Sequence, residues 1–510
     1  MPAIRNALTD ILNTTSWSFP AEDANKTNYQ GTLHTIGLSS SAYGNEMAQS
    51  LYLLRSKLGD EMKKNILSSL YRKVFNPTLQ ALRNNNANKE FTWLTSSGNH
   101  NSVTLSNVTS AALSVIQDKN ERAVFLAIAE RYSNNSLVGF TEDGYCSEGV
   151  GYYTYGFGHY ILLRENIWQA SGGKIDLFAR PKIDRVVRFV PGMEIINGVY
   201  AAIGDCEPNI QPGKQVMYYL NKNFNLGFKN YDEVLIDDID QPTLANIMYF
   251  FPNSSSLAAP VTTNIKKEIR HYFNIAGVLT VRPSTTKGFD MGATFKGGNN
   301  NEHHNHNDVG SYSIAMGEKI VMGDPGLGIY TPTYFGPDRY TYKTTSSYGH
   351  PVPIVAGVQQ SEGKNAQAII IDTNFTDNKD VFSMDISSAY NVPALKKLVR
   401  TFTYERSDEG FTEVKDDISF SSPQTYESAL ITRANWKQLA KNIIEFTGPT
   451  GKMIAEIISP VAFSISSEEI KEAKEPYTRI AIRLDKPITS GTFSIVFRPQ
   501  KNIPKTKKNN

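Results

Sequence analysis

The sequence predicts an α+β protein in which a helical first half is followed by a second half of antiparallel β-sheets. Apolar residues of the first half recur every three or four positions, as they do on amphipathic helices. The pattern changes near residues 255–275, after which short β-rich runs alternate with turns of Gly, Asn, Asp and Pro. Because 510 residues suffice for more than one domain, we expect a helical domain over residues 1–260 and a β-sheet domain over residues 261–510.

The helical period is clearest in four stretches of the first half. One is the series Leu51, Leu54, Leu58, Met62, Ile66 and Leu70, and the others are Val103 to Ile116, Glu121 to Tyr132 and Tyr152 to Trp168. Asn76-Pro77 and the Asn-rich residues 84–88 are expected to break helices. Consecutive helices joined by short loops predict helical hairpins packed in a row or a ring.

Nine short runs of the second half are expected to form strands. They are Val278–Val281, Tyr312–Ala315, Ile320–Met322, Ala368–Ile371, Arg400–Tyr404, Ile443–Phe446, Ile454–Ile458, Arg479–Leu484 and Thr492–Phe497. The sequence Met-Gly-Glu-Lys at residues 316–319 is typical of a hairpin turn between two of them. So many strands with short connections predict stacked antiparallel sheets.

Composition excludes several classes of protein. The net charge of +2 gives no global electrostatic attraction to nucleic acid, and no apolar run approaches the roughly 18–20 residues that span a bilayer. The cysteines Cys146 and Cys206 allow one disulfide at most, which cannot be a disulfide scaffold. Since the N-terminus lacks an apolar signal core, the chain is either cytoplasmic or a form from which a signal has been removed. The composition leaves the oligomeric state open.

A histidine-rich segment is the strongest candidate for a metal site. The chain has eight histidines, and three of them lie within the sequence EHHNHND at residues 302–308. In an extended segment His304, His306 and Asp308 would share one face, and Asp324 and His350 follow further along the chain. Imidazole and carboxylate ligands suit zinc. Alternative ligand sets remain open, notably the three residues on one face, and so does a polar turn with solvated histidines.

Two further sequences of the first half contain groups that could take part in chemistry. SSGNHN places Asn99 and His100 just before a predicted helix, where Asn99 could equally serve as a helix cap. TEDGYCSEGVGYYTYGFGHY carries Glu148, Tyr152 and Tyr155, although aromatics at helical spacing often belong to a core. Together with the histidine-rich segment, these residues suit a cleft between two domains.

These sequences together resemble the heparinase II/III-like superfamily of polysaccharide lyases. HNHNDVGSYSIAMGEKIVMGDPG, followed by RYTYKTTSSYGHPVP, is similar to the β-domain signature of that family. DGYCSEGVGYYTYG resembles its EG-x-x-Y-x-x-Y-G motif, and GNHN its Asn-His motif. The resemblance implies an incomplete (α/α) toroid followed by an antiparallel multi-sheet β-sandwich domain. It also implies β-elimination at a uronic acid residue, in which a base removes the C5 proton and an acid protonates the leaving O4.

The resemblance also assigns catalytic roles. It implies that Asn99 and His100 neutralise the uronate carboxylate, which stabilises the developing enolate. Tyr152 is expected to act as the acid and, for some epimers, as the base, with Tyr155 as the alternative tyrosine. His304 is expected to be the other base.

Further positions are implied to bind substrate or metal. Substrate contacts are expected from Glu148, Tyr155, Arg339 and Tyr340. The zinc ligands carry over as His306, Asp324 and His350, and the ion is expected to be structural. One departure affects the helical motif: the family often has Pro after the EG pair, whereas Val150 stands here, which loosens the register of the tyrosine assignment.

The expected partner is an anionic, uronate-containing polysaccharide. A glycosaminoglycan of the hyaluronan, chondroitin or heparan type is the first choice, and alginate is the alternative within the same superfamily. Endo or exo action stays open. Two hypotheses of other classes are a zinc-dependent hydrolase using metal-bound water and a non-catalytic glycan-binding protein. Because family members are mostly exported, we expect a periplasmic or secreted protein with its signal removed, with a cytoplasmic location as the alternative.

Overall fold

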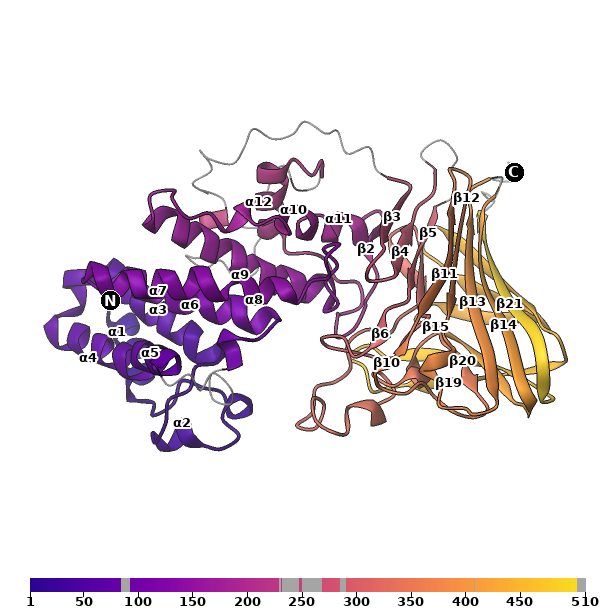
Figure 1. The fold of residues 1–510 in the computed structure, drawn as a ribbon, viewed down its shortest axis with the longest axis horizontal. Helices are drawn as coiled ribbons and strands as arrows, with labels where there is room; N and C mark the ends of the chain where they lie inside the picture. The colour runs from indigo at the N-terminus through magenta and orange to yellow at the C-terminus, as the bar shows by residue number, and fades with distance from the viewer. Residues whose placement is uncertain are drawn as a thin grey trace, which may run out of the picture. The chain divides into compact units, whose positions relative to one another are not determined.

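A computed structural model describes residues 1–83, 92–228, 231, 247–249, 268–284, 290–407 and 409–501 (Figure 1). The chain forms two compact units. The helical unit comprises Met1–Phe140, Tyr152–Asp184 and Gly213–Thr263, and the β unit comprises Thr141–Gly151, Arg185–Pro212 and Asn264–Asn510. Two segments from the first half of the chain, residues 141–151 and 185–212, therefore group with the β-sheets. The predicted break at residues 84–88 and the predicted boundary at 260/261 lie outside the described residues.

The helical unit contains α1 (Pro2–Asn13), α2 (Thr27–Gln30), α3 (Leu38–Leu54), α4 (Asp60–Leu70), α5 (Asn76–Arg83), α6 (Asn99–Val115), α7 (Lys119–Tyr132), α8 (Asn134–Val138), most of α9 (Gly149–Ala170), and α12 (Lys214–Phe224). Helix α3 packs along α6, and α6 packs along α7. The last three predicted helices are confirmed as α6, α7 and α9. The leucine series beginning at Leu51 falls on two helices, because a 3-10 turn and Gly59, with φ of 78°, separate α3 from α4.

The expected helix break at Asn76-Pro77 is wrong. A π-helix at Tyr71–Phe75, which has a wider turn, leads from α4 directly into α5. Pro77 is the second residue of α5. Proline is tolerated in the first turn of a helix, where its missing N–H costs little. The Thr78 hydroxyl donates to the Val74 carbonyl oxygen at 2.8 Å and so satisfies one carbonyl of the irregular turn.

The β unit consists of antiparallel sheets, as predicted. Its strands are β1 (Glu194–Ile196), β2 (Val199–Tyr200), β3 (Arg270–Phe273), β4 (Val278–Val281), β5 (Met291–Lys296), β6 (Asn299–Asn300), β7 (Tyr312–Met316), β8 (Lys319–Met322), β9 (Ile354–Val355), β10 (Gly363–Gln367), β11 (Ile369–Phe375), β12 (Lys379–Asp385), β13 (Leu395–Glu405), β14 (Phe411–Gln424), β15 (Tyr426–Thr432), β16 (Asn435–Ala440), β17 (Ile443–Thr447), β18 (Gly451–Ile458), β19 (Phe463–Ile470), β20 (Tyr477–Leu484) and β21 (Ile488–Lys501). Two short helices, α10 (Ile183–Val186) and α11 (Phe189–Met193), precede β1.

Three larger sheets and the two-stranded sheets β1-β2 and β10-β6 form the β unit (Figure 1). The strand orders of the three larger sheets are β11-β12-β13-β14-β21-β18-β17-β16, β19-β20-β15-β9 and β3-β4-β5-β7-β8. Buried side chains from all three belong to one hydrophobic core. The stacked rings of Phe295 on β5 and Phe402 on β13, with centroids 4.5 Å apart, join two of the sheets. Burial of these apolar inner faces is the main force that holds the sheets together.

All nine predicted strand segments overlap observed strands, although Ala368 lies just before β11. The predicted hairpin is also present: β7 ends at Met316, β8 begins at Lys319, and Gly317 adopts the positive φ of 61° that such turns need. Among the described residues, no helix combines the length and the apolar character needed to cross a membrane. The two cysteines are buried free thiols in the β unit.

Candidate functional site

Three loops of the β unit bring together three residues that could hold a metal ion. His306 lies between β6 and β7, Asp324 follows β8, and His350 follows a 3-10 turn at Ser347–Gly349. One potential ligand atom from each residue lies within 4.8 Å of the others, and all three side chains are buried. The ligand set assigned by the family resemblance therefore forms a cluster that could hold a metal ion, called the metal cluster below.

The hydrogen bonds of the two imidazoles indicate which nitrogen each would offer. His350 Nε2 lies 3.0 Å from the Thr344 carbonyl oxygen, and its Nδ1 lies 3.2 Å from Asp324 Oδ2. His306 Nε2 lies 3.0 Å from Asp205 Oδ1, and its buried Nδ1 has no hydrogen-bond partner. Metal-binding histidines commonly donate their second N–H to a carbonyl or carboxylate. An unpartnered buried Nδ1 opposite a carboxylate therefore fits a bound cation.

Electrostatics in the cluster shift the pKa values of His350 and Asp324 in the directions that favour their charged forms. Burial opposes protonation of His350, but the Asp324 carboxylate outweighs it, and the pKa of His350 is raised. Burial likewise opposes ionisation of Asp324, yet the neighbouring His350 lowers the pKa of Asp324 well below its usual value. For His306 burial dominates and lowers the pKa, which keeps the imidazole neutral, as a metal ligand must be.

The alternative ligand set of His304, His306 and Asp308 does not form such a cluster among the described residues. The carboxylate of Asp308 instead forms a buried ion pair with Lys296, which also lies 3.4 Å from Glu302. Glu302 and Asp308 thereby fix both ends of the histidine-rich segment to β5.

His304 does not belong to the metal cluster. Its backbone adopts the left-handed conformation, with φ of 52°, which turns the side chain away from the direction of His306 in an extended segment. Its Nδ1 lies 2.7 Å from Asp205 Oδ2, and 18% of the side chain is exposed. An N–H donated from Nδ1 to a carboxylate places the ring lone pair on Nε2, the arrangement that a general base requires.

Asp205 is the central residue that the sequence did not reveal. Its buried carboxylate accepts hydrogen bonds from His304, His306, Tyr334 and Arg339. Burial opposes ionisation, but these donors outweigh it and hold the pKa of Asp205 far below its usual value. Asp205 is one of 50 acidic residues and stands in no recognisable motif, so only the fold identifies it.

Of the predicted substrate-binding residues of the β unit, Arg339 contacts the same carboxylate and Tyr340 contacts the histidine-rich loop. Arg339 donates to Asp205 Oδ2 at 2.9 Å and to the Asn305 carbonyl oxygen at 3.0 Å, and its guanidinium lies over the rings of Tyr334 and Phe335. The Arg339 guanidinium is thus already paired with the Asp205 carboxylate. The Tyr340 hydroxyl accepts a hydrogen bond from Asn305 Nδ2 at 3.0 Å.

In the helical unit, the predicted Asn-His pair begins α6 and lies against α9. Gly156 of α9 allows this approach, because a Cβ there would lie 2.7 Å from that of Asn99. The Ser102 hydroxyl donates to the Gly156 carbonyl oxygen at 2.7 Å and ties the two helices together. Burial lowers the pKa of His100, and the carboxylate of Glu22 acts in the opposite direction.

The two candidate tyrosines occupy the same helix, α9. Tyr155, next to Gly156, is 41% exposed, and burial and the charge of Glu22 raise its pKa. Tyr152 is half-buried one turn earlier. Glu148 is buried and belongs to the β unit, just before the helix. Asn99, His100 and Tyr155 therefore gather within one unit, and Glu22 is a neighbour of this group that sequence reasoning missed.

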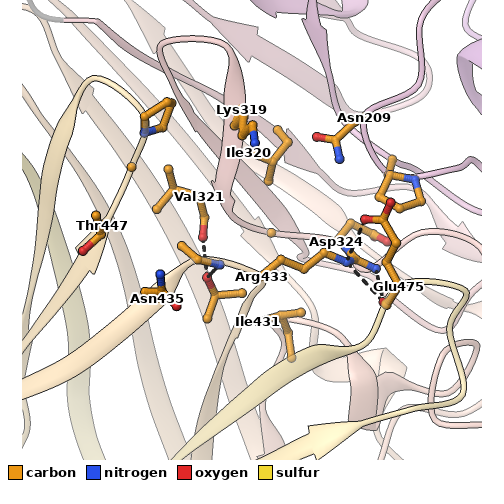
Figure 2. A pocket seen from close by; sticks show the side chains of 17 residues that line it. Asn209, Lys319, Ile320, Val321, Asp324, Ile431, Arg433, Asn435, Thr447 and Glu475 are labelled. Carbon is orange, nitrogen blue, oxygen red and sulfur yellow. Dashed lines mark hydrogen bonds and ion pairs between the residues drawn. The ribbon is translucent and has the colours of Figure 1, made fainter.

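A cavity of about 380 Å³ lies beside Asp324 of the metal cluster (Figure 2). Gly323 and Asp324 form part of its wall, together with the β7–β8 hairpin and the turns after β15 and β17. Arg433 donates to the carbonyl oxygens of Pro325 and Glu475 at the same wall. Of the three residues in the metal cluster, Asp324 therefore borders this cavity.

Solved structures with this fold include polysaccharide lyases. A heparinase III superimposes with a TM-score of 0.65 at 12% identity, over 98% of this chain and 74% of the other. Heparan sulfate lyase HepC from Pedobacter heparinus gives a TM-score of 0.60 at 12% identity, over 91% and 68%. Another heparinase III structure gives 0.62 at 13% identity, over 91% and 69%. No protein-family model and no curated protein sequence matches the chain.

At such low identity the likeness establishes the fold. The chain has the architecture of heparinase III, an incomplete (α/α) toroid followed by a β-sandwich domain, as the sequence resemblance predicted. The activity of the chain is a separate question that depends on its own residues.

Proposed function

We propose that this chain is a polysaccharide lyase that cleaves a uronate-containing glycosaminoglycan by β-elimination. The observation that carries the proposal is the position of His304, a partly exposed imidazole held by a buried carboxylate beside a metal-ligating cluster. The fold shared with a heparan sulfate lyase and with heparinase III supports this reaction class and makes heparan sulfate the first substrate to test. Alginate is the alternative polymer.

The roles follow from the demands of β-elimination. The C5 proton of a uronate is weakly acidic, so the adjacent carboxylate must be neutralised before a base can remove it. Asn99 and His100 would neutralise that carboxylate, and His304 would accept the C5 proton at Nε2. Tyr152, or Tyr155 in the alternative assignment, would protonate the leaving O4. The product is a 4,5-unsaturated uronate.

The metal cluster has a structural role in this proposal. His306, Asp324 and His350 would hold a zinc ion, which neutralises the buried Asp324 and links three loops. The loop with His306 also carries His304, so the ion would stabilise the backbone from which His304 projects.

A panel of polymers tests the function. Heparan sulfate, hyaluronan, chondroitin and alginate are incubated with the protein, and far-UV absorbance and product size are followed over time. We expect absorbance to rise with one of them, since the new C4–C5 double bond is conjugated with the carboxylate, and we expect Tyr152→Phe or Tyr155→Phe to abolish the rise. Chain shortening without absorbance would indicate a zinc hydrolase, and binding without turnover a glycan-binding protein; either result would refute the proposal.

A further inference from the structure

The carboxylate of Asp205 has a donor at every position where it can accept one. Oδ1 accepts from His306 Nε2 at 3.0 Å and from the Tyr334 hydroxyl at 2.7 Å. Oδ2 accepts from His304 Nδ1 at 2.7 Å and from Arg339 Nη2 at 2.9 Å. The Asp205 side chain has no exposed surface. A buried carboxylate with four donors is a rigid part of the structure, because any rotation breaks hydrogen bonds that water cannot replace.

Two glycines allow the segment that carries Asp205 to lie close to the histidine-rich loop and to the loop after Asp324. Gly204, with φ of 61°, lies where a Cβ would come within 3.0 Å of the His304 carbonyl oxygen. On the other side, Gly326 lies where a Cβ would come within 2.3 Å of the Cys206 carbonyl oxygen, to which the Leu327 N–H donates at 2.9 Å. The segment that carries Asp205 therefore docks on the histidine-rich loop and on the loop after Asp324.

We propose that Asp205 is a positioning residue that orients the predicted base His304 and the metal ligand His306 with one carboxylate. This inference rests on the proposed function, because it assigns His304 the role of base. By accepting the Nδ1–H of His304, Asp205 leaves the lone pair on Nε2. By accepting the Nε2–H of His306, it leaves the lone pair on Nδ1, which is buried and has no hydrogen-bond partner. The two histidines thus use opposite tautomers because they meet opposite oxygens of the same group.

One consequence is that metal binding and the orientation of His304 are linked. A displacement of the His306 ring would weaken its hydrogen bond to Oδ1 of Asp205. Because both oxygens belong to one planar carboxylate, the hydrogen bond between Oδ2 and His304 would change as well. Loss of the ion would therefore disturb His304 even though His304 is not a ligand.

The test compares Asp205→Asn with a matched variant, Asp380→Asn. Asp380 is also a buried carboxylate of the β unit, but its partners are Arg270 and Arg406. Metal-free proteins are titrated with Zn²⁺ against a chromophoric chelator, and kcat and KM are measured at saturating Zn²⁺. We expect Asp205→Asn to bind Zn²⁺ about 10–100-fold more weakly. We expect its kcat to fall about 100-fold or more with KM nearly unchanged, since the amide favours the wrong His304 tautomer. Asp380→Asn should keep wild-type Zn²⁺ affinity and kcat.

Each result decides part of the inference. If Asp205→Asn keeps wild-type Zn²⁺ affinity, the link to the metal cluster is refuted, and if it keeps wild-type kcat, the link to His304 is refuted. If Asp380→Asn loses as much Zn²⁺ affinity and kcat as Asp205→Asn does, the effects are not specific to Asp205, and the inference is refuted. If the wild-type protein turns over no polymer, the proposed function fails, while the Zn²⁺ titration still tests the link between Asp205 and the metal.

A second measurement uses the unaltered chain and so does not depend on whether Asp205→Asn folds. Side-chain ¹⁵N spectra of the eight histidines are recorded with and without Zn²⁺, and the His304 signals are assigned with His304→Gln. We expect Zn²⁺ removal to shift the ring signals of His304 together with those of His306 and His350, while His34 of the helical unit does not respond. Unchanged His304 signals would overturn the linkage.

Discussion

At the scale of single residues, His304 and His306 differ in exposure and contact opposite oxygens of Asp205, although only one residue separates them. His306 is completely buried in the metal-ligating cluster, whereas His304 retains contact with solvent. The left-handed backbone at His304 is the local cause, because it breaks the alternation that would place both rings on one face. Substitutions at the two positions should therefore have different effects.

We expect His304→Ala to reduce kcat on the cleaved polymer by about 100-fold or more, as loss of a general base does, and to leave the zinc content near one per chain. His306→Ala should lose the ion and lower the unfolding temperature of the β unit, because it removes a ligand and leaves Asp205 Oδ1 without one donor. Elemental analysis, calorimetry and steady-state kinetics on both variants check this. Loss of zinc from His304→Ala would show that the ligands are assigned wrongly.

His100 gives a prediction for pH. Burial lowers its pKa in the folded protein below the usual 6.5, so between the folded and unfolded pKa values the unfolded chain binds the proton more readily. This contribution to stability is complete above pH 6.5 and is lost as the pH falls below it. Urea unfolding of the wild type and of His100→Gln between pH 8 and pH 5, followed by tryptophan fluorescence, measures it. The wild type should lose more stability on acidification than the variant, and a difference independent of pH would contradict the assignment.

At the scale of elements, the start of α6 depends on the absence of a side chain on α9. A methyl group at position 156 would lie 2.7 Å from Asn99 Cβ and 3.1 Å from its Cα, and neither atom can rotate away. The first turn of α6, with Asn99 and His100, would have to move. The position of these residues is therefore set by a helix–helix contact.

Gly156→Ala should lower the free energy of unfolding by about 1–3 kcal/mol through overpacking and should also lower kcat, since it displaces Asn99. Gly151→Ala is the control in the same helix: its new Cβ meets Ile210 at 3.4 Å, an ordinary contact. That variant should be neutral or up to about 1 kcal/mol more stable, because alanine favours the helix. Urea unfolding and kinetics on both variants decide this, and equal effects at the two positions would refute the argument.

At the scale of the whole molecule, the features that could be predicted from sequence were those encoded locally. Strands such as Val278–Val281 were predictable because turn residues flank short β-branched runs. The three residues that cluster as a possible metal site were predictable because the family motifs that contain them are contiguous. Asp205 was not predictable, because its four partners lie 99 to 134 residues away. The π-turn before Pro77 was missed for a related reason: a wider turn accommodates a residue that local rules exclude from a helix.

The division into two units gives the last prediction. All three metal-ligating residues belong to the β unit, so bound zinc should stabilise that unit alone, by about 2.7 kcal/mol when the free ion is at 100 times its Kd. Trp17, Trp93 and Trp168 lie in the helical unit, and Trp436 on β16 is the fourth tryptophan of the chain. In Trp436→Phe, tryptophan fluorescence therefore follows the helical unit only. A chelator should lower the temperature of one calorimetric transition and leave the fluorescence transition of this variant unchanged, and added Zn²⁺ should restore the calorimetric trace. If the fluorescence transition moves with the calorimetric one, the two units unfold together and the ion stabilises both.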